Sequence, residues 1–83
     1  MSEATFILTM KAPICRNKLP MMTRVAQNNN ITVNVIDLDI VDTKEDLENL
    51  HLHGLPTIRY KDKEIFGDFS ERDVSTLFAT DLE

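Results

Sequence analysis

This chain has little sulfur available for redox chemistry, because its 83 residues contain a single cysteine, Cys15. One cysteine cannot form an internal disulfide, so no covalent cross-link stabilises the fold, and this suits a reducing compartment. Basic residues are also few: nine Lys and Arg against fourteen Asp and Glu give a net charge of −5. Binding to nucleic acid or to an anionic membrane needs clustered Lys and Arg. We therefore expect neither as a partner.

Long apolar runs are missing as well. No stretch reaches the roughly 18 consecutive apolar residues that a transmembrane helix needs. Residues 1–3 lack the basic start and apolar centre of a signal peptide, so we expect a cytoplasmic protein. The 83 residues, 42% of them hydrophobic, suit one domain spanning residues 1–83, and we expect a monomer. A chain of this size buries roughly 60% of its unfolded surface, so its stability should be marginal.

The first third of the chain predicts a strand followed by a helix. Consecutive apolar residues at 6–8 are typical of a strand covered on both faces, and we predict this strand over residues 5–10. Pro13 falls at the first helical position, where its missing N–H costs nothing, and Asn28-Asn29-Asn30 ends the helix. Pro20 lies inside the helix and removes a hydrogen bond, so we predict a bend there. The apolar stripe consists of Ile14, Cys15, Leu19, Met21, Met22, Val25 and Ala26.

The middle of the chain predicts a second strand and a short helix. Apolar residues alternate over 31–38, which indicates a strand, and the connecting helix makes it parallel to the first. A helix follows over residues 42–54 and is stopped by Gly54. Its start is marked by Asp42 with Glu45 or by Thr43 with Asp46, and its buried side by Leu47 and Leu50.

The last third predicts a hairpin and a final helix. Strands at 57–60 and 64–67, joined by the charged turn 61–63, form an antiparallel pair. Ser70 and Asp73 resemble a capping box. The apolar stripe of the helix that follows consists of Val74, Leu77, Phe78 and Leu82.

Cys15 lies where a strand meets a helix, within residues 11–20. Unpaired backbone N–H groups and the helix dipole at such a turn favour a thiolate over a thiol. Ala12 occupies the exposed position three residues earlier, so the spacing is that of a C-x-x-C site without its first sulfur. Lys11 either adds to the local positive potential or is merely solvated. Taken alone, a single cysteine is more often a small buried core residue.

Other candidate ligands have simpler interpretations. His51 and His53 lie two residues apart near a helix end. With one cysteine and no second pair of ligands, we expect no metal site. The acidic residues between Asp37 and Glu48 are typical of a solvated face that includes helix-start acids.

The predicted element order is β-α-β-α-β-β-α, an α/β arrangement with a mixed four-stranded sheet flanked by helices. Within it lie Pro13-x-Cys15, Pro20 five residues after the cysteine, and Gly54-Leu55-Pro56-Thr57 ahead of the hairpin. Together these features resemble the thioredoxin superfamily over nearly the whole chain. The resemblance implies a thioredoxin-like fold, a bend at Pro20, and a cis peptide bond before Pro56 facing the site. Such bonds are a minority of about 5–6% of X-Pro bonds.

The resemblance also implies roles for individual residues. Cys15 matches the resolving cysteine, which attacks the mixed disulfide that the first cysteine forms with its target. Ala12 stands at the position of that missing nucleophile. A neighbouring groove would pair with an extended segment of a disulfide-containing protein. The groove residues are Lys11, Pro13, Ile14, Leu55 and Pro56. No cofactor is implied, and electrons would come from a reductase or from glutathione.

Departures from the family pattern leave several functions open. Lys11 stands in place of the family's tryptophan and Phe6 in place of its buried acid, and Gly67-Asp68 only partly matches a segment with which glutaredoxins hold glutathione. Without a sulfur at position 12, no dithiol cycle can run. The chain is then a thioredoxin-like disulfide reductase or electron donor that lacks its nucleophile, or a redox-inactive interaction module. A glutathione-dependent reductase is a further alternative.

The origin of Ala12 is also open. Alanine just before a helix start costs about 1 kcal/mol relative to Ser, Thr, Asn or Asp, so stability gives no reason for its presence. It is either a natural degeneration of a redox site or a laboratory Cys-to-Ala change.

Overall fold

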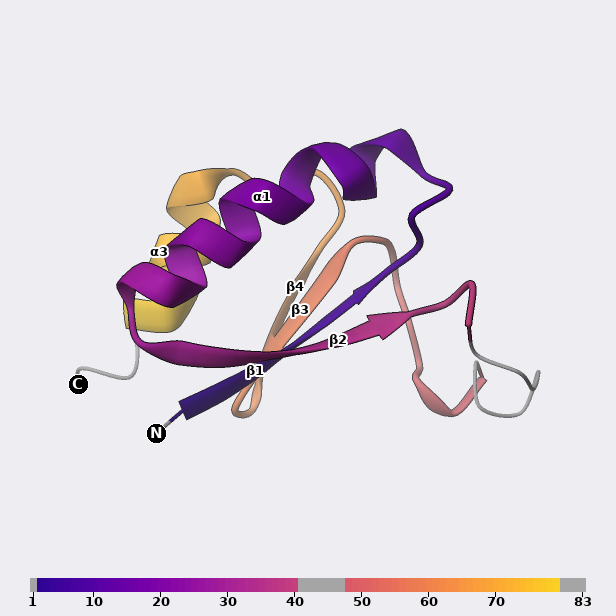
Figure 1. The fold of residues 1–83 in the computed structure, drawn as a ribbon. Coiled ribbons are helices and arrows are strands. Elements are labelled where there is room, and N and C mark those ends of the chain that lie inside the picture. The colour runs from indigo at the N-terminus through magenta and orange to yellow at the C-terminus, as the bar shows by residue number, and fades with distance from the viewer. Residues whose placement is uncertain (1, 41–47, 80–83) are drawn as a thin grey trace.

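A computed structural model describes residues 2–40 and 48–79 of the chain. These residues form a four-stranded sheet with two helices on one of its faces (Figure 1). The sheet order is β2-β1-β3-β4, with β1 parallel to β2 and antiparallel to β3, and β3 antiparallel to β4. This confirms the predicted mixed sheet. The elements are β1 (Ser2–Leu8), α1 (Pro13–Asn28), β2 (Ile31–Asp37), β3 (Thr57–Tyr60), β4 (Lys63–Phe66) and α3 (Glu71–Ala79).

The bounds predicted for the first strand were wrong at both ends. β1 begins at Ser2, because β2 offers a pairing partner from Ile31 onward. It ends at Leu8 and not at Met10, because the chain turns at Thr9, whose carbonyl accepts the Ala12 N–H at 3.2 Å. The second strand ends one residue earlier than predicted, at Asp37.

The hairpin is tighter than predicted. Tyr60 pairs with Lys63, so the turn contains two residues and β4 covers 63–66 where 64–67 was predicted. Lys61 has a positive φ of 57°, as two-residue hairpin turns require. Gly67 has a φ of 84° and turns the chain away from the sheet. A side chain at that φ would be strained, which explains a glycine there.

Helix α1 has the bounds expected from its sequence. Pro13 is at its start, and it ends at Asn28 with Asn29 as its C-cap. Asn30 adopts the left-handed conformation, with a φ of 57°, that often follows a helix end. The helix continues through Pro20 without interruption, so the predicted bend stays a prediction.

Helix α3 begins with the predicted capping box. The Ser70 N–H donates to the Asp73 carboxylate at 2.9 Å, and the Asp73 N–H donates to the Ser70 hydroxyl at 3.2 Å. The bond from the Ser70 N–H to the carboxylate is the main reason that the pKa of Asp73 lies below its ordinary value, and the Ser70 side chain, as a hydrogen-bonding group beside that carboxylate, lowers this pKa further. Leu82 and residues 42–47 of the predicted 42–54 helix lie outside the described residues. Of residues 48–54 only 48–49 are helical, so the predicted helix end at Gly54 was wrong. The helix stops earlier because His51 adopts the left-handed conformation, with a φ of 52°.

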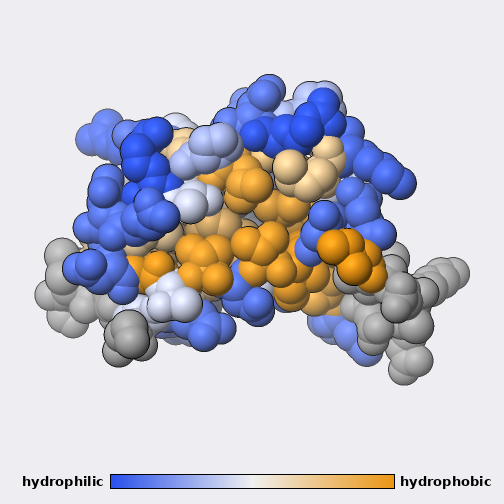
Figure 2. All heavy atoms as spheres, in the orientation of Figure 1, coloured by the Kyte–Doolittle hydropathy of each residue, from blue (hydrophilic) through white to orange (hydrophobic). Residues whose placement is uncertain are grey.

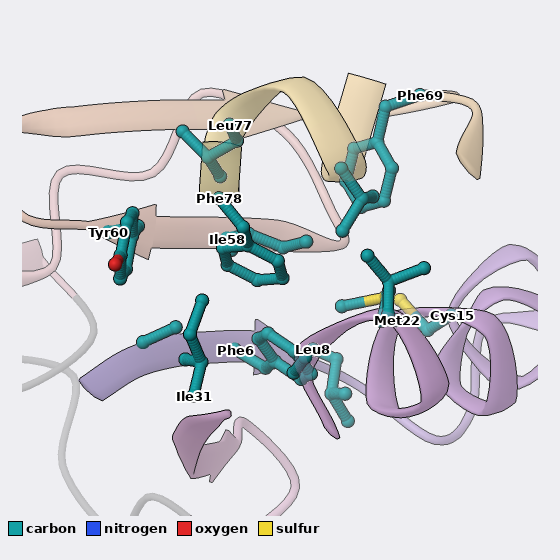
Figure 3. Packing of buried hydrophobic residues seen from close by; sticks show 14 residues of the cluster. Phe6, Leu8, Cys15, Met22, Ile31, Ile58, Tyr60, Phe69, Leu77 and Phe78 are labelled. Carbon is teal, nitrogen blue, oxygen red and sulfur yellow. The ribbon is translucent and has the colours of Figure 1, made fainter. Parts of the chain in front are cut away.

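The core lies between the sheet and the two helices, as Figure 3 shows. The β1 residues at 6–8 are less than 2% exposed, as predicted for a strand covered on both faces. In α1 the fully buried part of the predicted stripe is narrower than the sequence suggested, because Ile14, Leu19 and Met21 are only partly buried. The buried cluster is Ala4, Phe6, Leu8, Cys15, Met22, Val25, Ala26, Ile31, Ile58, Tyr60, Phe69, Val74, Leu77 and Phe78.

Candidate functional site

The strand-to-helix turn forms one half of the candidate site. Ala12 has an extended backbone, with φ −90° and ψ 124°, and is the N-cap of α1. Its carbonyl accepts the Arg16 N–H at 3.2 Å, which opens the helix. The Ala12 methyl group has no hydrogen-bond acceptor, so the side chain at the N-cap position does not accept a hydrogen bond from the first N–H groups of the helix. The helix mouth is therefore available to a polar group from outside.

Two side chains that the sequence reasoning did not include in the site hold this turn in place. The carboxylate of Asp39, just past β2, accepts a hydrogen bond from the Thr9 hydroxyl at 2.9 Å. The same hydroxyl oxygen accepts the Lys11 N–H at 3.3 Å. From the other side, Arg16 donates from Nη1 to the Met10 carbonyl at 2.7 Å. The carboxyl ends of parallel strands meet at one sheet edge, and this rule could have placed Asp39 beside the turn.

Lys11, in contrast, is held only loosely. Its side chain is 85% exposed, and its Nζ lies 4.0 Å from the Asp39 carboxylate. An ion pair of this length and exposure contributes little to stability. Lys11 thus adds a mobile positive charge at the entrance to the turn.

The two positions of the incomplete C-x-x-C spacing differ in burial. Cys15 is fully buried, as expected for the resolving position, and lies beside Met22 in the apolar cluster (Figure 3). Ala12 was expected to be exposed, and this was wrong: it is half-buried and packs against the same cluster. The reason is that the turn at Thr9 folds residue 12 back over the sheet end. As the chain stands, its one thiol has no access to solvent.

The other half of the site is the loop that enters β3. Pro56 is buried, Leu55 is partly buried, and the peptide bond between them is cis. The Thr57 hydroxyl donates to the Gly54 carbonyl at 2.6 Å and closes this loop. The Pro56 carbonyl accepts the Gly67 N–H at 3.0 Å. The loop is thereby fixed to the segment that leaves β4.

The register of the sheet brings the two halves together. Ile7 pairs with Thr57 in an antiparallel ladder, so one further step along that ladder sets Pro56 beside Leu8. The chain then needs only the turn at 9–12 to reach the start of α1. Figure 1 shows the end of β1, the start of α1 and the start of β3 at the same end of the sheet. Of the predicted site residues, Ala12, Pro13, Ile14, Leu55 and Pro56 all lie at this end, with Lys11 at its entrance.

Lys18 connects α1 to the segment that follows β4, which the sequence gave no reason to expect. Its Nζ donates to the Phe69 carbonyl, lies 2.9 Å from the Asp68 carboxylate and sits 5.5 Å from the centre of the Phe69 ring. Its side chain is only 16% exposed. The Gly67 N–H is hydrogen-bonded to the Pro56 carbonyl. Lys18 therefore links the helix of Cys15 to the loop of Pro56 through residues 67–69.

Other concave or titratable features lie elsewhere. An open groove lies between β4 and α3, lined by Ile65, Phe69 and Leu77 among others but not by Ala12 or Cys15. Residues 2–40 and 48–79 contain no group of three His, Cys, Asp or Glu side chains placed to hold a metal ion. Neither helix within those ranges has the length and apolar character needed to cross a bilayer.

Comparisons with solved structures find proteins of the same fold. Thioredoxin 1 from the thermophilic eubacterium Thermosipho africanus has a TM-score of 0.79 at 21% identity, over 96% of this chain and 93% of that one. Thioredoxin O1 from Arabidopsis thaliana has a TM-score of 0.79 at 15% identity, over 96% and 77%. A malarial protein has a TM-score of 0.77 at 18% identity, over 100% and 99%. No family model and no curated protein matches the sequence. The chain has a thioredoxin-like fold.

Proposed function

We propose that this chain belongs to the thiol-disulfide oxidoreductases, as a protein disulfide reductase or electron donor whose attacking cysteine is replaced by Ala12. The observation that carries the proposal is the meeting of the α1 mouth with the Leu55–Pro56 loop at one end of the sheet. Cys15 lies one turn inside that mouth and is fully buried. A sulfur at position 12 would stand at the N-cap, where the helix dipole favours the thiolate.

The chemistry needs two cysteine thiols, and the chain has one. In the complete cycle, a thiolate at position 12 attacks a target disulfide, forms a mixed disulfide and expels one target thiolate. The Cys15 thiolate then attacks the sulfur at position 12 and releases the second target thiolate. Two electrons pass to the target, and positions 12 and 15 are left as a disulfide. A dithiol reductant, a reductase or glutathione must reduce that disulfide before the next turnover.

A redox-inactive interaction module is the second candidate, and a specific observation favours it for the chain as it stands. The only thiol is 0% exposed, so it cannot reach a target disulfide. The groove residues Ala12, Leu55 and Pro56 are still in place, and an extended segment could pair with the backbone there. Binding without electron transfer would then be the whole activity.

The glutathione alternative has less support. Its sequence argument rests on Gly67 and Asp68, and both are already engaged within the chain. The Gly67 N–H donates to the Pro56 carbonyl, and the Asp68 carboxylate pairs with Lys18. A glutathione site that used the Gly67 N–H would have to break its hydrogen bond to the Pro56 carbonyl.

The deciding experiment restores the sulfur. We expect the Ala12→Cys variant to reduce insulin with dithiothreitol as electron source, whereas the unchanged chain gives only the background rate. The matched control is the double variant Ala12→Cys with Cys15→Ala. Incubated with insulin in the absence of dithiothreitol, it should form a mixed disulfide with the target and stop there, because no resolving thiol remains. An Ala12→Cys protein with a native circular dichroism spectrum and no activity above background would refute the oxidoreductase proposal.

The interaction module has its own measurement. The unchanged chain is titrated with oxidised insulin, which it cannot reduce, and backbone amide shifts are recorded by NMR. Shifts confined to residues 11–15 and 55–57 would support binding in the groove. If these amides do not move while Ala12→Cys turns over insulin, the groove has no binding role apart from the chemistry.

A further inference from the structure

The outer edge of β2 is open. β2 is an edge strand in the sheet order, and no described residue pairs with its outer side. The Leu38 N–H donates to the Leu8 carbonyl at 2.8 Å, so residue 38 directs its backbone groups toward β1. Because these directions alternate along a strand, residues 32, 34 and 36 also face β1. The backbone N–H and C=O groups of 31, 33, 35 and 37 therefore point outward.

This edge lacks the features that normally prevent pairing with another chain. Edge strands are usually short or carry Lys, Pro or other charged residues. β2 has seven residues, no Pro and no basic residue, and its single charge is Asp37 at the end. The opposite edge, β4, has four residues and carries Lys63 and Glu64. Of the two edges, β2 is the one that accepts a further strand.

Apolar side chains lie along the same edge. Val33 and Val35 occupy the sheet face that carries α1, since their partners in β1 are Ala4 and Phe6 of the core. Val33 packs against the core, whereas Val35 is 50% exposed. Figure 2 shows apolar atoms gathered in a band along β2 below the polar surface of α1. The side chains of a strand added here would pack beside this band as cross-strand neighbours.

We propose that the occupant is a second copy of this chain, with its β2 antiparallel to the first about a two-fold axis at Asn34. In this register Val33 pairs with Val35 of the second copy, and Ile31 with Asp37. Each of these is an outward-facing residue, so every pair exchanges two N–H···O bonds. No two charged residues stand opposite each other. A register with its two-fold axis at residue 37 would place Asp37 of one copy opposite Asp37 of the other. The repulsion between the two carboxylates disfavours this register.

The pairing joins two sheets into one and leaves both candidate sites open. The sites lie beyond the carboxyl end of β2, and antiparallel pairing sends these ends in opposite directions. Seven residues per copy is well below the roughly 20–30 residues per side of a standard interface. We therefore expect a weak dimer, with a Kd on the order of 0.1–1 mM, and a monomer in dilute solution.

The test uses NMR and sedimentation of the whole chain from about 0.05 mM to about 2 mM, a range that brackets the expected Kd. We expect concentration-dependent amide shifts at 31–37 and a rise in mass toward twice the monomer. Val35→Lys places a charge on the edge and should raise Kd at least about tenfold. Ser75→Lys, on the exposed side of α3, adds the same charge elsewhere and should leave Kd unchanged or lower it, because the chain carries a net charge of −5.

A second variant protects the test against misfolding. Val35→Pro removes an outward N–H that takes no part in the β1–β2 ladder, so the fold should survive, as checked by circular dichroism, while the dimer is lost. Three results would overturn the proposal: a constant monomer mass over the whole range, shifts confined to residues outside 31–37, or an unchanged Kd in Val35→Lys.

Discussion

Lys18→Met tests the link between the helix of Cys15 and the loop of Pro56. Methionine keeps most of the aliphatic stem, so the substitution removes the ammonium group and little packing. Three interactions are lost: the hydrogen bond to the Phe69 carbonyl, the ion pair with Asp68 and the contact with the Phe69 ring. The stem already lies in a site that is 16% exposed, so methionine fits there without a new exposed apolar surface.

The magnitude follows from how well each interaction is shielded from water. Asp68 is 86% exposed, so solvent screening limits the ion pair to about 0.5 kcal/mol. The charged hydrogen bond to a part-buried carbonyl contributes about 1–1.5 kcal/mol, at or just below the lower limit for charged donors because the site is not fully buried. The contact with the ring adds about 0.5 kcal/mol. We therefore expect the free energy of unfolding to fall by about 2 kcal/mol, which lowers Tm by about 8–16 °C in a domain of this size.

Urea unfolding followed by circular dichroism measures this loss, and the m-value should stay constant. Lys11→Met is the matched control, because the Lys11 side chain is 85% exposed and its Nζ lies 4.0 Å from the Asp39 carboxylate. We expect a change below about 0.5 kcal/mol there. Asp68→Asn should cost about 0.5 kcal/mol, and the remainder of the Lys18 effect should persist in that background. Equal midpoints for Lys18→Met and Lys11→Met would refute the reasoning.

Three further predictions concern the helices. Met22→Ala truncates a fully buried side chain and should lower the free energy of unfolding by about 2–5 kcal/mol. Met10→Ala is the control: Met10 is 39% exposed, so its substitution should change the urea midpoint little. Ala12→Ser supplies the missing N-cap oxygen and should raise the free energy of unfolding by about 1 kcal/mol; no gain in the urea midpoint would contradict the capping argument. The pKa of Asp73 is lowered in the fold, mainly by the Ser70 N–H, so its contribution is present above about pH 4 and is lost as the pH falls through the lowered pKa. The difference in free energy of unfolding between the unchanged chain and Asp73→Asn, measured by urea unfolding at neutral and at acidic pH, should therefore shrink as the pH falls. A difference that does not depend on pH would contradict this account of the Asp73 carboxylate.

Element types were readable from local patterns, but several element ends were not. Residues 6–8, the buried centre of the α1 stripe at Cys15, Met22, Val25 and Ala26, and the Ser70–Asp73 box all behave as their periodicity or spacing predicts. The ends of β1 and β4 were misplaced, because pairing partners and the turns at Thr9 and Lys61 decide where a ladder stops. Those partners lie far away in the sequence. A pattern read along one segment does not contain them.

The sequence by itself determined the types of β1, α1, β2, β3, β4 and α3 and the position of Cys15 one turn inside a helix, because each depends on neighbouring residues. It also shows directly that there is no second cysteine. Only the tertiary structure decided that Ala12 is half-buried, that Asp39 holds the turn beside it, and that Lys18 reaches Phe69. These contacts join residues 30 and 51 positions apart. They arise from the parallel pairing of β1 with β2 and from the packing of α1 over the sheet, which set distances that no local sequence signal encodes.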